Sequence, residues 1–171
     1  MKNKLNNDYG CQSMVGEIKR VLVKHPKDAY QDQFKIDGES KKLNYLGKPD
    51  YKKSKKDYEQ LIDFFNTNNI EIHYLPIDEY TSIDSIYTHD PCIISNSGVI
   101  LSNMGKSDRQ TEPEAIASYF NSINVPILGQ IKSPGTLEGG DVVWIDERTI
   151  AVGEGYRTNA EGIHQFKSLL K

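Results

Sequence analysis

Charged residues in the second half of the chain stand where predicted strands end. Two carboxylate pairs each flank a short segment, and two arginines each follow a predicted hairpin: Asp84 and Asp90, Glu138 and Asp141, Arg109 and Arg157. A guanidinium offers forked donors that match carboxylate oxygens, and arginines suit an anionic group. If the strand ends converge on one cavity, this set would bind a zwitterion such as an arginine derivative. Capping carboxylates and surface salt bridges are the alternative, and they need no ligand.

Three elements are predicted in the first half of the chain. A strand at 20–23 ends at His25-Pro26, and the polar stretch at 27–51 that follows is expected to be a long loop, either disordered or a binding lid. Apolar residues on one face at 58–65 predict a helix, and the lysines at 52, 53, 55 and 56 before it are expected to form a solvated first turn. The alternation at 70–74 predicts a half-buried strand.

The second half alternates more regularly between hairpins and helices. Hairpins are predicted at 93–101 and 142–152, with a further strand at 125–128. Thr111 and Thr158 each begin a Thr-x-x-Glu capping box, which predicts a helix start. The last helix has an apolar stripe at Ile163, Phe166, Leu169 and Leu170.

The two hairpin–helix stretches resemble copies of one unit. Arg109 and Arg157 occupy the same place in each copy, 157 − 109 = 48 residues apart. This period is typical of propellers, and at that spacing the 171 residues hold about three and a half units. The chain stops on a helix that should lead into another strand. We therefore expect a truncated ring with an open sheet edge.

Composition excludes several classes of protein. The 21 basic and 24 acidic residues give a net charge of −3, which argues against broad nucleic-acid binding. No apolar run is long enough to span a membrane, and the N-terminus carries no secretory signal. Cys11 and Cys92 are far apart and lack zinc-site spacing. Reduced thiols in a cytoplasmic protein are the expectation.

Specific motifs add a family resemblance. Ser133-Pro-Gly-Thr-Leu-Glu-Gly-Gly-Asp141 and Arg157-Thr-Asn-Ala-Glu-Gly162 resemble segments of the dimethylarginine dimethylaminohydrolases. These belong to the guanidine-modifying superfamily, with arginine deiminase and the amidinotransferases. Leu46-Gly-Lys-Pro-Asp50 and the stretch from Asp84 to Pro91 also match. The resemblance extends from about Arg20 to the last residue.

The resemblance implies roles for the carboxylates. Glu138 matches the glutamate that holds the guanidinium nitrogens and aids proton movement during attack. Asp84 and Asp90 match substrate-binding aspartates, the second also directed toward the guanidinium. His89 lies within the same motif, where a backbone contact with substrate is expected.

The resemblance also implies the far end of the site and the fold. Arg109 and Arg157 match arginines that bind the amino-acid end, and Leu46 lies on a loop that closes over substrate. The implied fold is an α/β five-bladed propeller, the pentein type, built from ββαβ units and here incomplete. Residues 1–171 would form one truncated domain with a polar tail at 1–19. No metal and no organic cofactor are implied.

The chain departs from the family in its nucleophile. The resemblance implies a cysteine near the C-terminus and a histidine in a later blade, and neither position exists here. Cys92 begins an apolar strand, where buried packing is expected, and Cys11 matches nothing. No cysteine–histidine pair is evident, although a reactive thiol needs a neighbouring base or cation.

The sequence therefore predicts the N-terminal part of a hydrolase that converts a methylated arginine to citrulline and an alkylamine. The isolated chain is expected to be inactive. A non-catalytic binding protein for arginine derivatives is one alternative, and a fragment of an arginine deiminase or amidinotransferase is another. The expected partners are a small arginine derivative and either a complementary C-terminal chain or a second copy at the open edge. Nucleic acid and membrane are not expected.

Overall fold

The computed structural model describes residues 9–170, and the chain divides into two units. Unit 1 comprises the described residues up to Gly16, His89–Gly105 and the chain from Phe120 on. Unit 2 comprises Glu17–Thr88 and Lys106–Tyr119. Helix α4 (Glu112–Ser122) begins in unit 2 and ends in unit 1.

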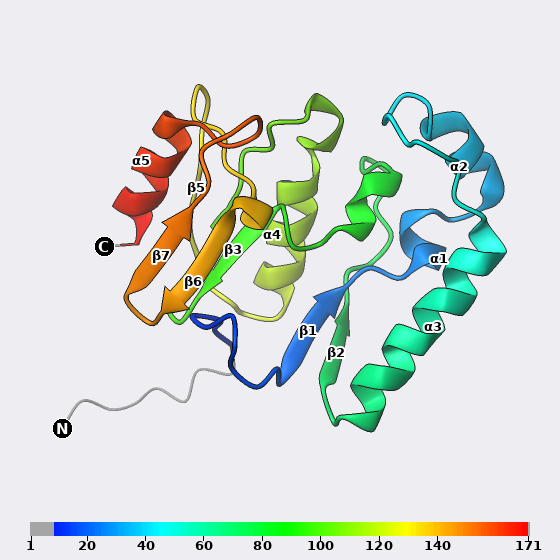
Figure 1. Ribbon diagram of the computed structural model, residues 1–171, viewed down its shortest axis with the longest axis horizontal. Coiled ribbons are helices and arrows are strands. Elements are labelled where there is room, and N and C mark those ends of the chain that lie inside the picture. Colours follow the sequence, from blue (N-terminus) through cyan, green and yellow to red (C-terminus); the bar gives the residue numbers. More distant parts are fainter. Residues whose placement is uncertain (1–8, 171) are drawn as a thin grey trace. The chain divides into compact units, whose positions relative to one another are not determined.

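Unit 2 contains a pair of parallel strands, three whole helices and the first part of α4. Strand β1 (Arg20–Val23) pairs with β2 (Glu71–Tyr74), in register from Arg20 opposite Glu71 to Val23 opposite Tyr74. Parallel strands need a long crossover, which here carries α1 (Pro26–Ala29), α2 (Gln33–Glu39) and α3 (Tyr51–Thr67). Figure 1 shows α3 running alongside the strand pair. Both predicted strands are confirmed.

The stretch at 27–51 is not the long loop that its polarity predicted. It contains α1 and α2, each with a capped start, because the side chains of His25 and Asp32 accept hydrogen bonds from helix backbone N–H groups. Ile36 is fully buried among Ala29, Leu43 and Ile83. One or two buried residues per short helix leave no periodic signal in the sequence.

Helix α3 starts before its apolar stripe. Asp50 caps it by accepting a hydrogen bond from the N–H of Lys53, so the lysines at 52, 53, 55 and 56 lie in its first turns. Of the predicted apolar stripe, Ile62 is buried, whereas Leu61 is 41% exposed. The stripe therefore overstates how much of α3 is covered.

Unit 1 contains both predicted hairpins. Strand β3 (Cys92–Ser95) pairs antiparallel with β4 (Gly98–Leu101), and β5 (Ile127–Gln130) pairs parallel with β4. Strand β6 (Val142–Asp146) pairs antiparallel with β7 (Thr149–Val152), and α5 (Ala160–Leu169) follows. The sheet of β3, β4 and β5 is mixed, because it contains one antiparallel and one parallel pair. Strands and helices alternate along the chain, which places it in the α/β class.

Strand β5 begins two residues later than predicted. Val125 does not extend in the sheet, because its N–H donates to the carbonyl of Phe120 and closes the end of α4. Asn124, with φ of 58°, makes the turn. The carbonyl of Pro126 then accepts from Val99 of β4, and the ladder starts there.

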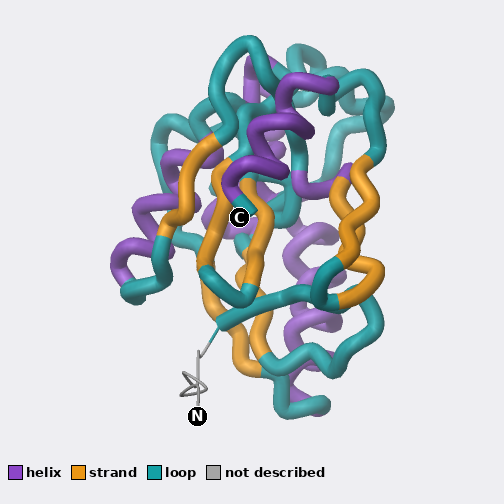
Figure 2. The backbone as a smooth tube through the Cα atoms, turned by 90° about the vertical axis from the view of Figure 1, so that its left-hand side faces the viewer, coloured by secondary structure: helices purple, strands orange, loops and turns teal. Residues whose placement is uncertain are grey.

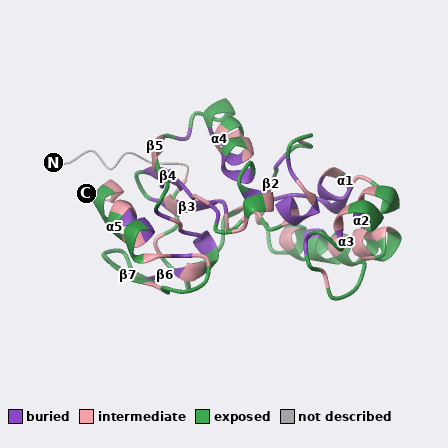
Figure 3. Cartoon of the chain, turned by 90° about the horizontal axis from the view of Figure 1, so that it is seen from above, coloured by how far each residue is buried: buried purple, intermediate pink, exposed green. Residues whose placement is uncertain are grey.

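The core of unit 1 lies between its strands and α5. Buried residues from both hairpins, the connection between β5 and β6, and α5 form one cluster: Ile93, Ile100, Ile131, Leu137, Val142 and Phe166. In Figure 2 the C-terminal helix lies in front of strands of its own unit, and in Figure 3 α5 carries buried residues on one side and exposed residues on the other. This packing holds the β6–β7 hairpin and the loop after it.

The start of α5 differs from the predicted capping box. Asn159 is the N-cap, since its side chain accepts from the N–H of Gly162, whereas Thr158 is fully buried and donates to Asp141. Thr111, at the other predicted box, donates its hydroxyl to the carbonyl of Tyr80. Both threonines thus tie loops to the body of their unit.

Within the described part of the chain, no helix is both long enough and apolar enough to cross a membrane.

Candidate guanidinium site

A small polar cavity of about 310 Å³ lies in unit 1. Its walls come from the turn before β3, the turn before β6 and the loop after β7: Asp90, Glu138, Gly140, Asp141, Tyr156 and Arg157. Three predicted site residues, Asp90, Glu138 and Arg157, therefore meet in one cavity although they are far apart in the sequence. His89 does not line it.

Glu138 is the best-positioned carboxylate of this cavity. Its side chain is only 5% exposed, and Oε1 accepts from the backbone N–H of Gly105 at 3.1 Å. Oε2 pairs with Nη1 of Arg157 at 3.0 Å. The backbone N–H of Glu138 donates to Thr158, whose hydroxyl donates to Asp141 at 2.6 Å. The carboxylate is thus held by backbone and side-chain contacts, and one of its oxygens binds a guanidinium group.

Two glycines allow the turns around Glu138 and Asp90 to approach each other. The N–H of Gly139 donates to the carbonyl of Asp90 at 2.8 Å. A Cβ on Gly139 would lie 2.2 Å from the carbonyl oxygen of His89 and 2.7 Å from that of Cys92. A Cβ on Gly140 would lie 2.8 Å from a carboxylate oxygen of Asp90. The Glu-Gly-Gly-Asp motif therefore needs glycine for this contact.

We expect Gly139→Ala to destabilise unit 1. A methyl group here meets two backbone carbonyls that no side-chain rotation can move, and overpacking of this kind costs about 1–3 kcal/mol. Chemical denaturation would measure the loss. Gly155→Ala is the matched control because nothing lies within 4 Å of its added Cβ. Equal stabilities for the two variants would show that the turns are not in close contact.

Arg157 lies in the loop between β7 and α5 and lines the cavity, whereas Asp90 lies before β3. The side chain of Arg157 is 40% exposed, in contrast to that of Glu138. An ion pair with one exposed partner is weak and can be exchanged. A ligand guanidinium could therefore replace the Arg157 guanidinium on Glu138.

The other predicted residues belong to unit 2. Asp84 lies in a 3-10 turn (Ile83–Ile86) and is 5% exposed. Its Oδ2 accepts from Nζ of Lys106 at 2.6 Å, and the same Nζ donates to the carbonyl of Leu43 at 2.9 Å. Leu46, the predicted lid residue, is fully exposed. Lys106 was not among the residues predicted from the sequence.

Arg109 is 2% exposed, and one carboxylate accepts two hydrogen bonds from its guanidinium. Its Nε and Nη2 donate to the two carboxylate oxygens of Glu112 at 2.9 and 2.7 Å. Nη2 also donates to the carbonyl of Tyr87, and the guanidinium lies 5.8 Å from the Tyr87 ring centre. Glu112, predicted only as part of a helix start, is therefore the partner of Arg109. The i, i+3 spacing of the two residues was the available signal.

Among the described residues no hydrogen bond joins either cysteine to a histidine. Cys92 is buried in β3, and this burial raises the pKa of its thiol to about 12. Cys11 is exposed, and its sulfur contacts the carbonyl of Ser13. Because the thiolate is the nucleophile, Cys92 is poorly suited to attack at neutral pH.

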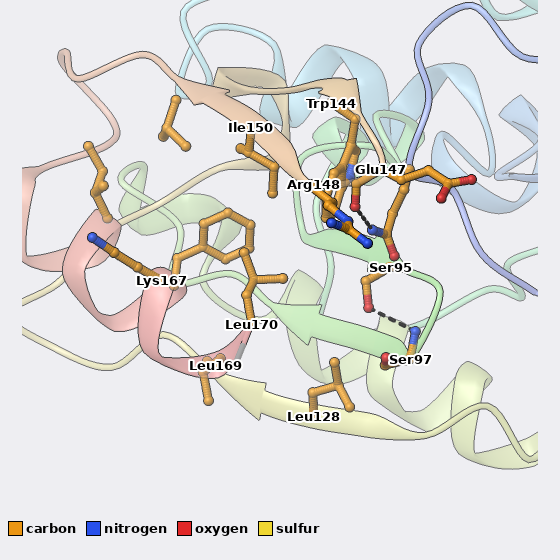
Figure 4. A pocket seen from close by; sticks show the side chains of 14 residues that line it. Ser95, Ser97, Leu128, Trp144, Glu147, Arg148, Ile150, Lys167, Leu169 and Leu170 are labelled. Atoms are coloured by element: carbon orange, nitrogen blue, oxygen red, sulfur yellow. Dashed lines mark hydrogen bonds between the residues drawn. The ribbon is translucent and has the colours of Figure 1, made fainter. Parts of the chain in front are cut away.

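A second and larger cavity of about 650 Å³ also lies in unit 1. Figure 4 shows Leu128, Ile150 and Leu170 reaching into it from β5, β7 and the end of α5. Its lining is mixed, because Glu147, Arg148 and Lys167 stand beside these apolar residues. This composition suits a packing surface better than recognition of a small cation.

Comparison with known proteins places the chain in a family. The family model for arginine deiminase matches residues 81–171, more than half of the chain. Dimethylarginine dimethylaminohydrolase of Pseudomonas aeruginosa is 32% identical over 128 residues, which cover 75% of this chain and 50% of that protein. The chain thus spans about half the length of this curated relative.

Solved structures agree with this placement. A Pseudomonas aeruginosa dimethylarginine dimethylaminohydrolase complexed with citrulline has a TM-score of 0.73 and 30% identity, covering 91% of this chain and 57% of that one. An amidinotransferase of saxitoxin biosynthesis from Microseira wollei has a TM-score of 0.65 at 12% identity, covering 95% and 59%, which shows a shared fold alone. The protein therefore belongs to the family of arginine deiminase and dimethylarginine dimethylaminohydrolase.

Proposed function

We propose that this chain supplies the guanidinium-binding part of a hydrolase that converts a methylated arginine to citrulline and an alkylamine. One observation carries the proposal: the buried carboxylate of Glu138 already binds a guanidinium, that of Arg157, in a cavity with two further carboxylates. A planar cation of a ligand would find the same acceptor. The names of the relatives supply the reaction class.

The proposed roles follow from the geometry of the cavity. A ligand guanidinium takes the place of Arg157 on Glu138, with Asp90 as a second acceptor. The displaced Arg157 is then available to the anionic end of the ligand. Attack by a thiolate on the guanidinium carbon forms a C–S bond and breaks the C–N bond to the alkylamine, which leaves with a proton. Water then replaces sulfur and gives the ureido group of citrulline.

Within this proposal Glu138 stabilises the positive charge and can accept a proton from a guanidinium nitrogen during the attack. The attacking cysteine and the histidine that protonates the amine would come from the remaining half of the family fold. That fold would be the five-bladed α/β propeller, of which this chain would form about three and a half units. Deiminase or amidinotransferase chemistry, or binding without chemistry, are the alternatives.

Calorimetric titration with dimethylarginine, arginine and citrulline tests the proposal. Citrulline is the matched control because it has nearly the same shape without the positive charge. We expect a guanidinium ligand to bind at least about tenfold more tightly than citrulline, as one charge-assisted contact on a buried carboxylate would give. Equal binding of all three, or no binding of any, would contradict it. Preference for unmethylated arginine would favour the deiminase alternative.

The proposal includes a partner at strand β7. Strand β4 pairs with β3 on one edge and with β5 on the other, whereas β7 pairs only with β6 among the described residues. By the repeat, a strand parallel to β7 is the missing element. The larger cavity beside β7 is lined by Ile150 and Val152 of that strand and by Leu170 after α5. These side chains can pack against the added strand. We propose that a complementary chain with the remaining half of the fold supplies this strand.

We expect the isolated chain to self-associate through this uncovered surface at high concentration. Size-exclusion chromatography combined with a thermal melt would detect it. Leu170→Glu should shift the chain toward monomer, because it places a charge among the apolar side chains of the larger cavity. Ser168→Glu is the control, since Ser168 is exposed and does not line the cavity. A sharply melting monomer at high concentration would instead favour a complete binding protein.

A further inference from the structure

Tyr156 is the one aromatic side chain in the wall of the small cavity of unit 1. The described lining otherwise consists of three carboxylates, one guanidinium and one glycine: Asp90, Glu138, Asp141, Arg157 and Gly140. The charged residues suit the nitrogens of a guanidinium ligand, whereas Tyr156 offers an apolar ring. Its side chain is fully exposed, so its position is not explained by packing in the core.

The turn that carries Tyr156 is fastened to the wall of this cavity at both ends. Before the turn, the N–H of Gly153 donates to the carbonyl of Asp141 at 2.9 Å. After it, the hydroxyl of Thr158 donates to the carboxylate of Asp141 at 2.6 Å. The N–H of Gly155 donates to the carbonyl of Thr158 at 2.9 Å and closes the turn. Tyr156 is therefore held beside the cavity, and its ring can contact a ligand there without movement of the loop.

Methylation changes what a guanidinium needs from its surroundings. Two methyl groups on one terminal nitrogen remove the N–H donors of that nitrogen, so a carboxylate placed against it gains no hydrogen bond and loses water. The face of an aromatic ring attracts a cation and also accepts its methyl groups, which is how methylated ammonium ions are bound in aromatic cages. Within the lining of this cavity, Tyr156 is the side chain that supplies such a face.

We propose that Tyr156 is the specificity-determining residue of the cavity and makes it favour a methylated guanidinium over an unmethylated one. The selectivity rests on the proposed function, in which the carboxylate of Glu138 binds the guanidinium of the ligand. Glu138 and Asp90 accept from the nitrogens that keep their N–H groups, and the Tyr156 ring contacts the methylated nitrogen. The favoured ligand class is a guanidinium whose methyl groups lie on one terminal nitrogen.

The test compares N,N-dimethylguanidinium with guanidinium, both as chloride salts at the same ionic strength, in an NMR titration of the full chain. Neither cation has an amino-acid end, so the cavity of unit 1 is sufficient to bind it. We expect the wild-type protein to bind the dimethylated cation about three- to tenfold more tightly, the range of a partly desolvated cation–ring contact. In Tyr156→Ala the two affinities should become equal. Tyr156→Phe keeps the ring and should keep the preference to within about twofold.

Tyr80→Ala is the matched control for the loss of an exposed ring. Tyr80 is exposed, lies in unit 2 and does not line the cavity, so its removal should leave the ratio of the two affinities as in the wild type. Because the Tyr156 side chain is fully exposed, Tyr156→Ala should melt close to the wild-type temperature. A change in the ratio then reports ligand recognition and not the stability of the unit.

Three results would overturn the role of Tyr156: a wild-type preference for guanidinium, a preference for the dimethylated cation that persists in Tyr156→Ala, or an equal loss of affinity for both cations in that variant. Glu138→Gln separates this inference from the proposed function, because it should weaken the binding of both cations. Binding that does not depend on Glu138 would contradict the proposed function. Glu138-dependent binding without a methyl preference would remove the role of Tyr156 alone, and absence of binding by either cation would remove both.

Discussion

Glu138→Gln is expected to weaken the binding of dimethylarginine or arginine by about 30- to 1000-fold, the range for removing one partner of a buried charge-assisted contact. The variant keeps the side-chain volume, and its amide oxygen can still accept from the N–H of Gly105. Arg157 is partly exposed and can turn to water when its partner becomes neutral. Affinity should therefore fall far more than stability, and calorimetry with a parallel thermal melt would separate the two.

Glu154→Gln is the matched control for this variant. Glu154 lies in the same loop as Arg157 but is exposed and does not line the cavity. Its affinity for the guanidinium ligand should stay within about twofold of wild type, because an exposed charge contributes little. Similar losses in both variants would mean that the net charge of the unit, and not the cavity, attracts the ligand.

The chain of residues 1–171 is expected to release no citrulline from dimethylarginine or arginine. The hydrolysis proposed for the family should therefore be undetectable. The guanidinium carbon is stabilised by resonance and needs a strong nucleophile. Burial raises the pKa of Cys92 to about 12, so its thiolate is scarce at neutral pH, and Cys11 has no histidine partner among the described residues. A colorimetric citrulline assay at high protein concentration would measure this.

The cysteine variants make the citrulline assay decisive. Turnover that disappears in Cys92→Ser would reveal an active site around β3, contrary to the burial of that thiol. Turnover that survives replacement of both cysteines by serine would contradict a cysteine mechanism altogether. Turnover that appears only after a complementary chain is added would support a split enzyme over a non-catalytic binding protein.

The hairpins of unit 1 could be predicted because their short apolar runs flank clear polar turns. Strands Val142–Asp146 and Thr149–Val152 together fill the hairpin predicted at 142–152. Helices α1 and α2 could not be predicted, because each is short and is stabilised by a cap and one or two buried residues. Such helices depend on tertiary packing more than on their own pattern.

The site residues divide in the same way. Asp90, Glu138 and Arg157 were predicted from their positions at strand ends, and the structure brings them to one cavity. Asp84 and Arg109 belong to the other unit, so their convergence with the first three stays a prediction. Lys106 was missed because a lysine in a polar loop has no sequence signal, and Glu112 was missed because its i, i+3 spacing from Arg109 was not used. Only the fold reveals which carboxylate Lys106 meets.

Amide chemical shifts during a titration with dimethylarginine are the most direct test of the central claim, that Glu138 binds the guanidinium of a ligand. The N–H of Gly105 donates to Glu138, and the N–H of Gly139 lies one residue away. We predict that the Gly105 and Gly139 resonances move on addition of dimethylarginine and stay in place on addition of citrulline. Saturable shifts confined to other residues, with Gly105 unmoved, would contradict the account.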